Sequence, residues 1–123
     1  MRAAVLTVSD GVSAGERVDE SGDLLAELLA AEGYEVERRV VPDDRETIAD
    51  AIVELAEEAA LVLTTGGTGL GPRDVTPEAT SEVLERAAPG IAEAIRAHVR
   101  EHDLARWLAE QLDELDRASA RVR

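Results

Sequence analysis

The chain has 123 residues, the length of one domain, which is enough to build a hydrophobic core. Its 27 acidic residues against 13 basic ones give a formal net charge of −14, and a field of this sign repels nucleic acid and anionic membranes. Disulfides, thiolate metal sites and cysteine nucleophiles are excluded, because there is no cysteine. No apolar run reaches membrane-spanning length and the start has no signal-peptide pattern, so we expect a cytoplasmic protein.

The first predicted element is a strand over residues 3–8, a nearly continuous apolar run typical of a central parallel strand covered on both faces. A long polar loop over residues 9–20 follows, at the strand end where open α/β sheets bind ligands. Ser21 is the predicted N-cap of the next helix, and Gly33 ends it in a left-handed conformation. The apolar stripe of this helix consists of Leu24, Leu25, Leu28 and Leu29.

The second predicted strand covers residues 34–41, and the charges of Arg38 and Arg39 place it nearer an edge of the sheet. Asp43 and Asp44 both come before the next helix, and Asp44 is the better candidate for its N-cap. This helix runs to about residue 59. Its predicted inward face consists of Ile48, Ile52, Leu55 and Ala59.

A third strand begins with the apolar residues 61–63 and leads into a loop with four glycines within six residues. Thr76 is the predicted N-cap of a helix that runs to about residue 87. After Pro89 and Gly90 a further helix carries apolar residues on one side. The alternation of strands and helices predicts a parallel sheet with right-handed crossovers.

The glycine-rich loop is the strongest functional signal. A turn of this kind between a strand and a helix presents backbone N–H groups, which suit a phosphate; the alternative is a tight structural turn. The loop matches neither the Walker A pattern nor the dinucleotide fingerprint, and the chain has no lysine, so an ordinary P-loop NTPase is excluded.

The last segment, residues 101–123, has the pattern of a charged amphipathic helix. It is expected to pack on its own sheet or to meet copies of itself in an oligomer. Nearby, His98 and His102 lack an evident third metal ligand and are interpreted as solvated polar residues. The apolar stripe of the predicted helix consists of Leu104, Trp107, Leu108, Leu112 and Leu115.

Three motifs in order resemble the MoaB/MogA family, the molybdopterin-binding domains of molybdenum-cofactor biosynthesis, which are related to the G domain of gephyrin. They are Leu6-Thr-Val-Ser-Asp-Gly with Asp19-Glu-Ser-Gly, then Val41-Pro-Asp, then Thr64-Thr-Gly-Gly-Thr-Gly with Arg73-Asp-Val-Thr-Pro-Glu-Ala-Thr. The resemblance covers roughly residues 3–100.

The resemblance implies an α/β fold, a three-layer sandwich around a mostly parallel sheet. We therefore expect a molybdopterin-binding domain over residues 1–100 and an added amphipathic helix over residues 101–123, for packing or oligomerisation. The family normally continues with another strand and a loop similar to Asn-Leu-Pro-Gly-Ser-Pro. Neither is present in this sequence, so we expect a truncated or re-engineered family member.

The resemblance also implies an activity, the MgATP-dependent adenylylation of molybdopterin to molybdopterin-AMP. Asp43 and Asp74 match the family's functional aspartates, as catalytic residues and Mg²⁺ ligands. Either one has a structural alternative: Asp43 as a helix cap, and Asp74 as a carboxylate near a helix N-terminus. The residues expected to bind ATP and molybdopterin are Thr7, Ser9, Asp10, Gly66, Gly67, Thr68, Gly69 and Arg73.

Three hypotheses follow. The first is a molybdopterin adenylyltransferase that acts on small-molecule substrates as a homotrimer. The second is a non-catalytic molybdopterin-binding module, and the third is a degenerate or engineered oligomeric scaffold derived from the family. None of the three involves nucleic acid or a membrane.

Overall fold

The computed structural model describes residues 1–68 and 70–102. The chain divides into two compact units. The first comprises Met1–Gly69 and Arg73–Val83, and contains the sheet; the second comprises Leu70–Pro72 and Leu84–Arg123. The predicted division at residue 100 stays a prediction, because residues 103–123 lie outside the described residues, together with the apolar stripe predicted for them.

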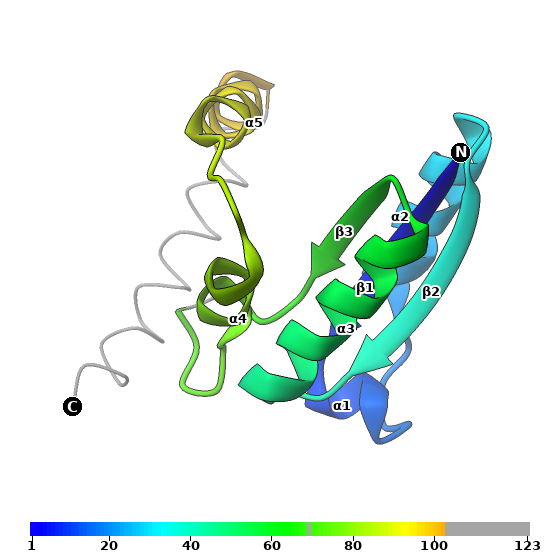
Figure 1. The fold of residues 1–123 in the computed structure, drawn as a ribbon, viewed down its shortest axis with the longest axis vertical. Coiled ribbons are helices and arrows are strands. Elements are labelled where there is room, and N and C mark those ends of the chain that lie inside the picture. Colours follow the sequence, from blue (N-terminus) through cyan, green and yellow to red (C-terminus); the bar gives the residue numbers. More distant parts are fainter. Residues whose placement is uncertain (69, 103–123) are drawn as a thin grey trace. The chain divides into compact units, whose positions relative to one another are not determined.

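Within the described residues, three parallel strands form the sheet, in the order β2-β1-β3 (Figure 1). They are β1 (Arg2–Val8), β2 (Glu35–Val41) and β3 (Leu61–Thr65). Ala3 pairs with Val36 on one side and with Leu61 on the other. The apolar run therefore occupies the centre and the arginine-bearing strand an edge of the described sheet, and both predictions are confirmed.

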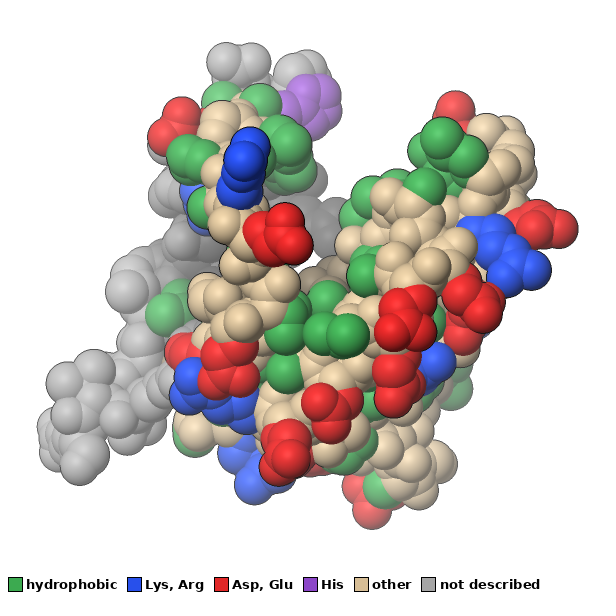
Figure 2. Space-filling view, viewed as in Figure 1, with side chains coloured by type: hydrophobic (Ala, Val, Ile, Leu, Met, Phe, Trp, Pro, Cys, Tyr) green, Lys and Arg blue, Asp and Glu red, His purple; other side chains and the backbone are tan. Residues whose placement is uncertain are grey.

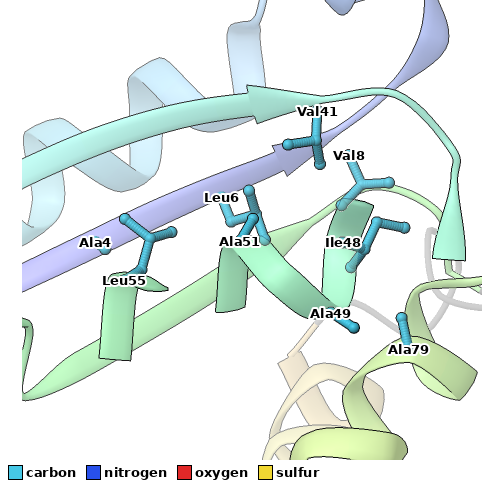
Figure 3. Close-up of a cluster of buried hydrophobic side chains, with 9 residues drawn as sticks. All are labelled: Ala4, Leu6, Val8, Val41, Ile48, Ala49, Ala51, Leu55 and Ala79. Carbon is cyan, nitrogen blue, oxygen red and sulfur yellow. The ribbon is translucent and has the colours of Figure 1, made fainter. Parts of the chain in front are cut away.

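Helices cover both faces of this sheet, α2 (Glu20–Ala31) on one and α3 (Arg45–Glu58) on the other (Figure 1). Side chains alternate along β1, so Ala3 and Val5 pack on the α2 side, while Ala4 and Leu6 pack on the α3 side. The three-layer α/β class is thus confirmed. The cluster on the α3 side, drawn in Figure 3, consists of Ala4, Leu6, Val8, Val41, Ile48, Ala49, Ala51, Leu55 and Ala79.

The inward face predicted for α3 is correct, and Asp44 caps this helix by accepting a hydrogen bond from the backbone N–H of Thr47 at 2.9 Å. The stripe predicted for α2 is only half correct. Leu25 and Leu29 face the sheet, whereas Leu24 and Leu28 are 56% and 55% exposed. The outer surface of α3 is acidic (Figure 2).

The described part of the chain contains three further helices, which are α1 (Asp10–Ser13), α4 (Thr76–Val83) and α5 (Pro89–His102). The predicted polar loop thus contains one helical turn, and α4 ends four residues before the predicted residue 87. Ala79 of α4 joins the core beside Ala49 of α3 (Figure 3). In the second unit, α5 begins at Pro89, a residue suited to a first helical position. No helix among the described residues is long and apolar enough to cross a membrane.

Candidate functional site

The loops that follow β1 and β2 are tied together by two aspartates. The backbone N–H of Asp10 donates to Oδ2 of Asp43 at 3.0 Å, and the backbone N–H of Asp43 donates to Oδ1 of Asp10 at 2.9 Å. Each carboxylate therefore accepts a hydrogen bond from the backbone N–H of the other residue. This exchange fixes both side chains at the carboxyl edge of the sheet, where the two parallel strands end.

The glycine loop after β3 lies against the same edge. Gly66 and Gly67 have φ angles of +90° and +56°, a region that side chains disfavour. A Cβ on Gly66 would collide with the carbonyl oxygen of Val8, and one on Gly67 would lie 3.2 Å from Oδ1 of Asp43. The glycines are thus required for the loop to pass this close to β1 and β2.

Thr76 fastens the loop from the other side. Its hydroxyl donates to the carbonyl oxygen of Gly66 at 3.2 Å, and the residue is buried. Thr76 is the first residue of α4 rather than its N-cap, so the predicted cap is wrong. The backbone N–H groups of Gly67 and Thr68 donate to no residue that the structure describes, and are available to a ligand.

Two carboxylates of the site have opposite pKa shifts. The Arg73 guanidinium, whose Nε donates to Oδ2 of Asp10 at 2.7 Å, holds the pKa of that carboxyl below its usual range, helped by the Asp43 N–H. Burial raises the pKa of Asp43, and the negative charges of Asp10 and Asp74 add to this rise. The Thr68 hydroxyl donates to Asp74 at 3.3 Å. A cation beside Asp43 would offset the repulsion that contributes to its raised pKa.

Asp19 explains the motif Asp19-Glu-Ser-Gly. It caps α2 by accepting a hydrogen bond from the backbone N–H of Gly22 at 3.0 Å, so the prediction that Ser21 is the cap is wrong. Its Oδ2 also accepts from the Thr7 hydroxyl at 2.7 Å and from Arg38 at 2.8 Å. A Cβ on Gly22 would collide with the Asp19 carboxylate. With its acceptors occupied in this way, Asp19 acts as a structural clamp.

These elements surround a polar hollow of about 300 Å³. Six of the predicted site residues line it: Thr7, Ser9, Asp43, Gly66, Gly67 and Asp74. Three others border the site through hydrogen bonds, namely Asp10, Thr68 and Arg73, while Gly69 lies outside the described residues. Within residues 1–68 and 70–102, no three acidic or histidine side chains are grouped as a complete metal site.

Sequence reasoning placed the loop over residues 9–20 at the ligand-binding end of the sheet, but it did not name the residues of α1, of the following loop and of the start of α2 that line this hollow. The residues concerned are Val12, Arg17, Val18, Asp19, Glu20 and Ser21. Asp19 and Ser21 could have been found, because they belong to a motif already singled out. Arg17 carried no signal, since its place depends on how the chain turns back over α1.

Comparisons with known proteins identify the family to which this chain is similar. The family described as a probable molybdopterin binding domain matches residues 4–116. A molybdopterin adenylyltransferase of Escherichia coli strain K12 is 40% identical over 101 residues, covering 78% of this chain and 52% of that protein. A molybdenum cofactor biosynthesis bifunctional protein of Synechococcus elongatus is 38% identical over 109 residues, covering 87% of this chain and 34% of that protein.

Among solved structures, the tungsten cofactor synthesizing protein MoaB from Pyrococcus furiosus aligns with a TM-score of 0.75 at 37% identity, over 83% of this chain and 64% of that one. The MoaB protein from Thermus thermophilus aligns with a TM-score of 0.72 at 44% identity, over 78% and 62% respectively. The chain thus spans about a third to a half of the two curated relatives and under two thirds of these structures.

Proposed function

The chain belongs to the MoaB/MogA family of molybdopterin-binding domains, and from this membership we propose that it acts in molybdenum-cofactor biosynthesis by adenylylating molybdopterin at the expense of MgATP. The observation that carries the proposal is the meeting of Asp43, Asp74 and the glycine loop at one polar hollow. Carboxylates and free backbone N–H groups together suit a reaction between two phosphate compounds.

Magnesium fits this donor set as an ion shared between protein and substrate. Mg²⁺ is commonly held by one or two carboxylates together with phosphate oxygens and water, and Asp43 and Asp74 supply such a pair. The raised pKa of Asp43 supports this assignment, because the repulsion that contributes to it would be relieved by a cation. When bound, the ion would neutralise phosphate charge and align the reacting oxygens.

In the proposed reaction, a terminal phosphate oxygen of molybdopterin attacks the α-phosphorus of ATP. The new P–O bond forms while the bond from the α-phosphorus to the β-phosphate oxygen breaks, and pyrophosphate leaves. Gly67 and Thr68 donate their backbone N–H groups to a phosphate, and Asp43 and Asp74 set the position of the positive charge. The proposal includes a homotrimer, which the solution mass tests directly.

The test is adenylyl transfer, with purified protein, MgATP and fresh molybdopterin, and products resolved by chromatography. We expect molybdopterin-AMP from the wild type and its loss in Asp43→Ala and Asp74→Ala. Asp50→Ala is the matched control, because Asp50 is an exposed carboxylate on α3. No product beside an active control enzyme would refute catalysis, and retained molybdopterin binding in that sample would favour the non-catalytic binding module.

A further inference from the structure

Arg17 differs from the other arginines of the sheet-containing unit. Arg2, Arg38, Arg39, Arg45 and Arg73 each form an ion pair with at least one acidic residue. Arg17 forms none with any residue that the structure describes, although the chain carries 27 acidic residues. Among the residues that the structure describes, it is also the only arginine that lines the polar hollow.

The backbone holds Arg17 in this place. Its N–H donates to the carbonyl oxygen of Gly11 at 3.2 Å, and the N–H of Glu16 donates to the same oxygen at 2.9 Å. Gly15, with a φ of +75°, makes the turn that brings the chain back over α1. The position of Arg17 is therefore set by the fold of its segment rather than by an acidic partner.

The aliphatic part of the side chain is positioned as well. It crosses Gly11 so closely that a Cβ there would lie 2.6 Å from Cδ of Arg17 and 3.1 Å from Cγ. Packing of the stem against a helix that lacks a side chain at this point restricts the directions open to the guanidinium. An arginine with a fixed stem loses less conformational entropy when it binds an anion.

The charges around the hollow indicate why an arginine without an acidic partner matters there. The carboxylates of Asp19, Asp43 and Asp74 line it, and a bare polyanion would be repelled by them. Arg73 is engaged by Asp10, and Arg38 is engaged by Asp19 and Asp23. Within the described residues, Arg17 is the cation beside the hollow whose charge is not already offset by a carboxylate.

Resting on the proposed function, we infer that Arg17 is a substrate-binding residue that receives a phosphate group in the polar hollow it shares with the glycine loop. Guanidinium and phosphate match in shape and form paired, charge-assisted hydrogen bonds. The phosphate belongs either to the triphosphate of ATP or to the terminal phosphate of molybdopterin, and separate titrations distinguish these sources.

The experiment is calorimetric titration of the wild type and its variants with ATP, with molybdopterin and with inorganic pyrophosphate. Arg17→Ala is expected to raise the dissociation constant of one substrate about tenfold, which is the effect of losing a hydrogen bond to a charged group. Arg17→Lys should recover only part of this loss, because lysine keeps the charge without the planar pair of donors. The substrate affected identifies which phosphate Arg17 holds.

Two further variants separate a contact from a general effect of charge. Arg2→Ala removes the same charge at the opposite end of β1 and should bind like the wild type. Gly11→Ala keeps the arginine but displaces the aliphatic part of its side chain. It should lower the affinity for the same ligand as Arg17→Ala does. The fold should stay intact, because Gly11 is helical. Circular dichroism checks the fold of each variant.

Affinities for all three ligands that are equal in Arg17→Ala and wild type would overturn the inference, as would a wild type that binds none of them. The proposed function fails separately. If ligand binding depends on Arg17 but no molybdopterin-AMP is formed, the role of Arg17 in binding stands and catalysis is refuted.

Discussion

Replacing Gly66 with alanine tests whether the glycine loop needs its close approach to β1. Gly66 combines a φ of +90° with a position where a Cβ would collide with the carbonyl oxygen of Val8. Because the obstacle is backbone rather than a flexible side chain, it cannot move away by changing rotamer. The variant must shift the loop or the end of β1.

Two terms set the expected cost. Placing alanine at a left-handed φ costs about 1–2 kcal/mol, partly offset by the reduced entropy of the unfolded chain. The collision adds about 1–3 kcal/mol, the usual penalty for overpacking a close contact. Gly33→Ala is the matched control, because Gly33 has a φ of +92° with nothing within 4 Å of the added Cβ. Gly66→Ala should therefore lose about 1–3 kcal/mol more than Gly33→Ala.

Urea denaturation followed by far-ultraviolet circular dichroism measures both losses. The difference between the two variants isolates the collision, since they share the dihedral cost. Equal losses in unfolding free energy would refute the close packing of Gly66 on Val8. A loss in Gly33→Ala larger than that in Gly66→Ala would contradict the reasoning about both positions.

Three further predictions, which involve four substitutions, use the same denaturation assay. Leu6→Ala, at a fully buried position, should lower the free energy of unfolding by about 2–5 kcal/mol. Leu24→Ala, on the exposed side of α2, should change it by no more than about 0.5 kcal/mol. Similar losses in the two variants would contradict the assignment of Leu6 to the core and of Leu24 to the surface. Thr7→Val keeps the volume but removes the hydroxyl that donates to Asp19, and should cost about 1–2 kcal/mol; no cost would show that this hydrogen bond does not contribute. The folded-state pKa of Asp43 is raised, so its contribution to stability is present below its unfolded value of about 3.9 and is lost as pH rises through the folded value. Asp43→Asn should therefore gain stability over the wild type as pH increases from 4 to 7, and a difference independent of pH would contradict the shift.

Much of the fold was predictable because the hydrophobic pattern is strong where burial is complete. The run over residues 3–8 predicted the central strand, and it is buried on both faces. The inward face of α3 followed the helical period for the same reason. Patterning failed on α2, where Leu24 and Leu28 continue the stripe beyond the width that the sheet covers. A stripe indicates which face turns inward, but its width depends on the partner surface.

The errors at helix starts have a different origin. Ser21 and Thr76 are both good N-caps by residue type, yet neither serves as one. Asp19 takes the cap of α2 because Thr7 and Arg38 from two strands also bind its carboxylate. The hydroxyl of Thr76 is engaged by the glycine loop. Contacts between segments distant in the sequence therefore determine where both helices begin, and the local sequence does not reveal these contacts.

The candidate site was predictable to the extent that motifs marked it. Asp43, Asp74, Gly66 and Gly67 line the hollow, whereas Gly69 lies outside the described residues. The pairing of Asp10 with Arg73, and the place of Arg17, were not predictable, because each depends on the path of a loop rather than on residue type or spacing.

The position of β1 has a consequence for how the chain acquires its structure. β1 is first in sequence but central in the sheet, and Ala3 must find both Val36 and Leu61. Among the strands that the structure describes, none pairs with a neighbour through a short hairpin, so each of these pairings requires a long loop to close before it contributes any free energy. A chain emerging from the ribosome keeps one edge of β1 unpaired until β3 has been made, because α2, β2 and α3 all precede β3 in the sequence. Refolding is accordingly expected to be slow for a domain of this size, with the period of exposure of this edge setting its tendency to aggregate.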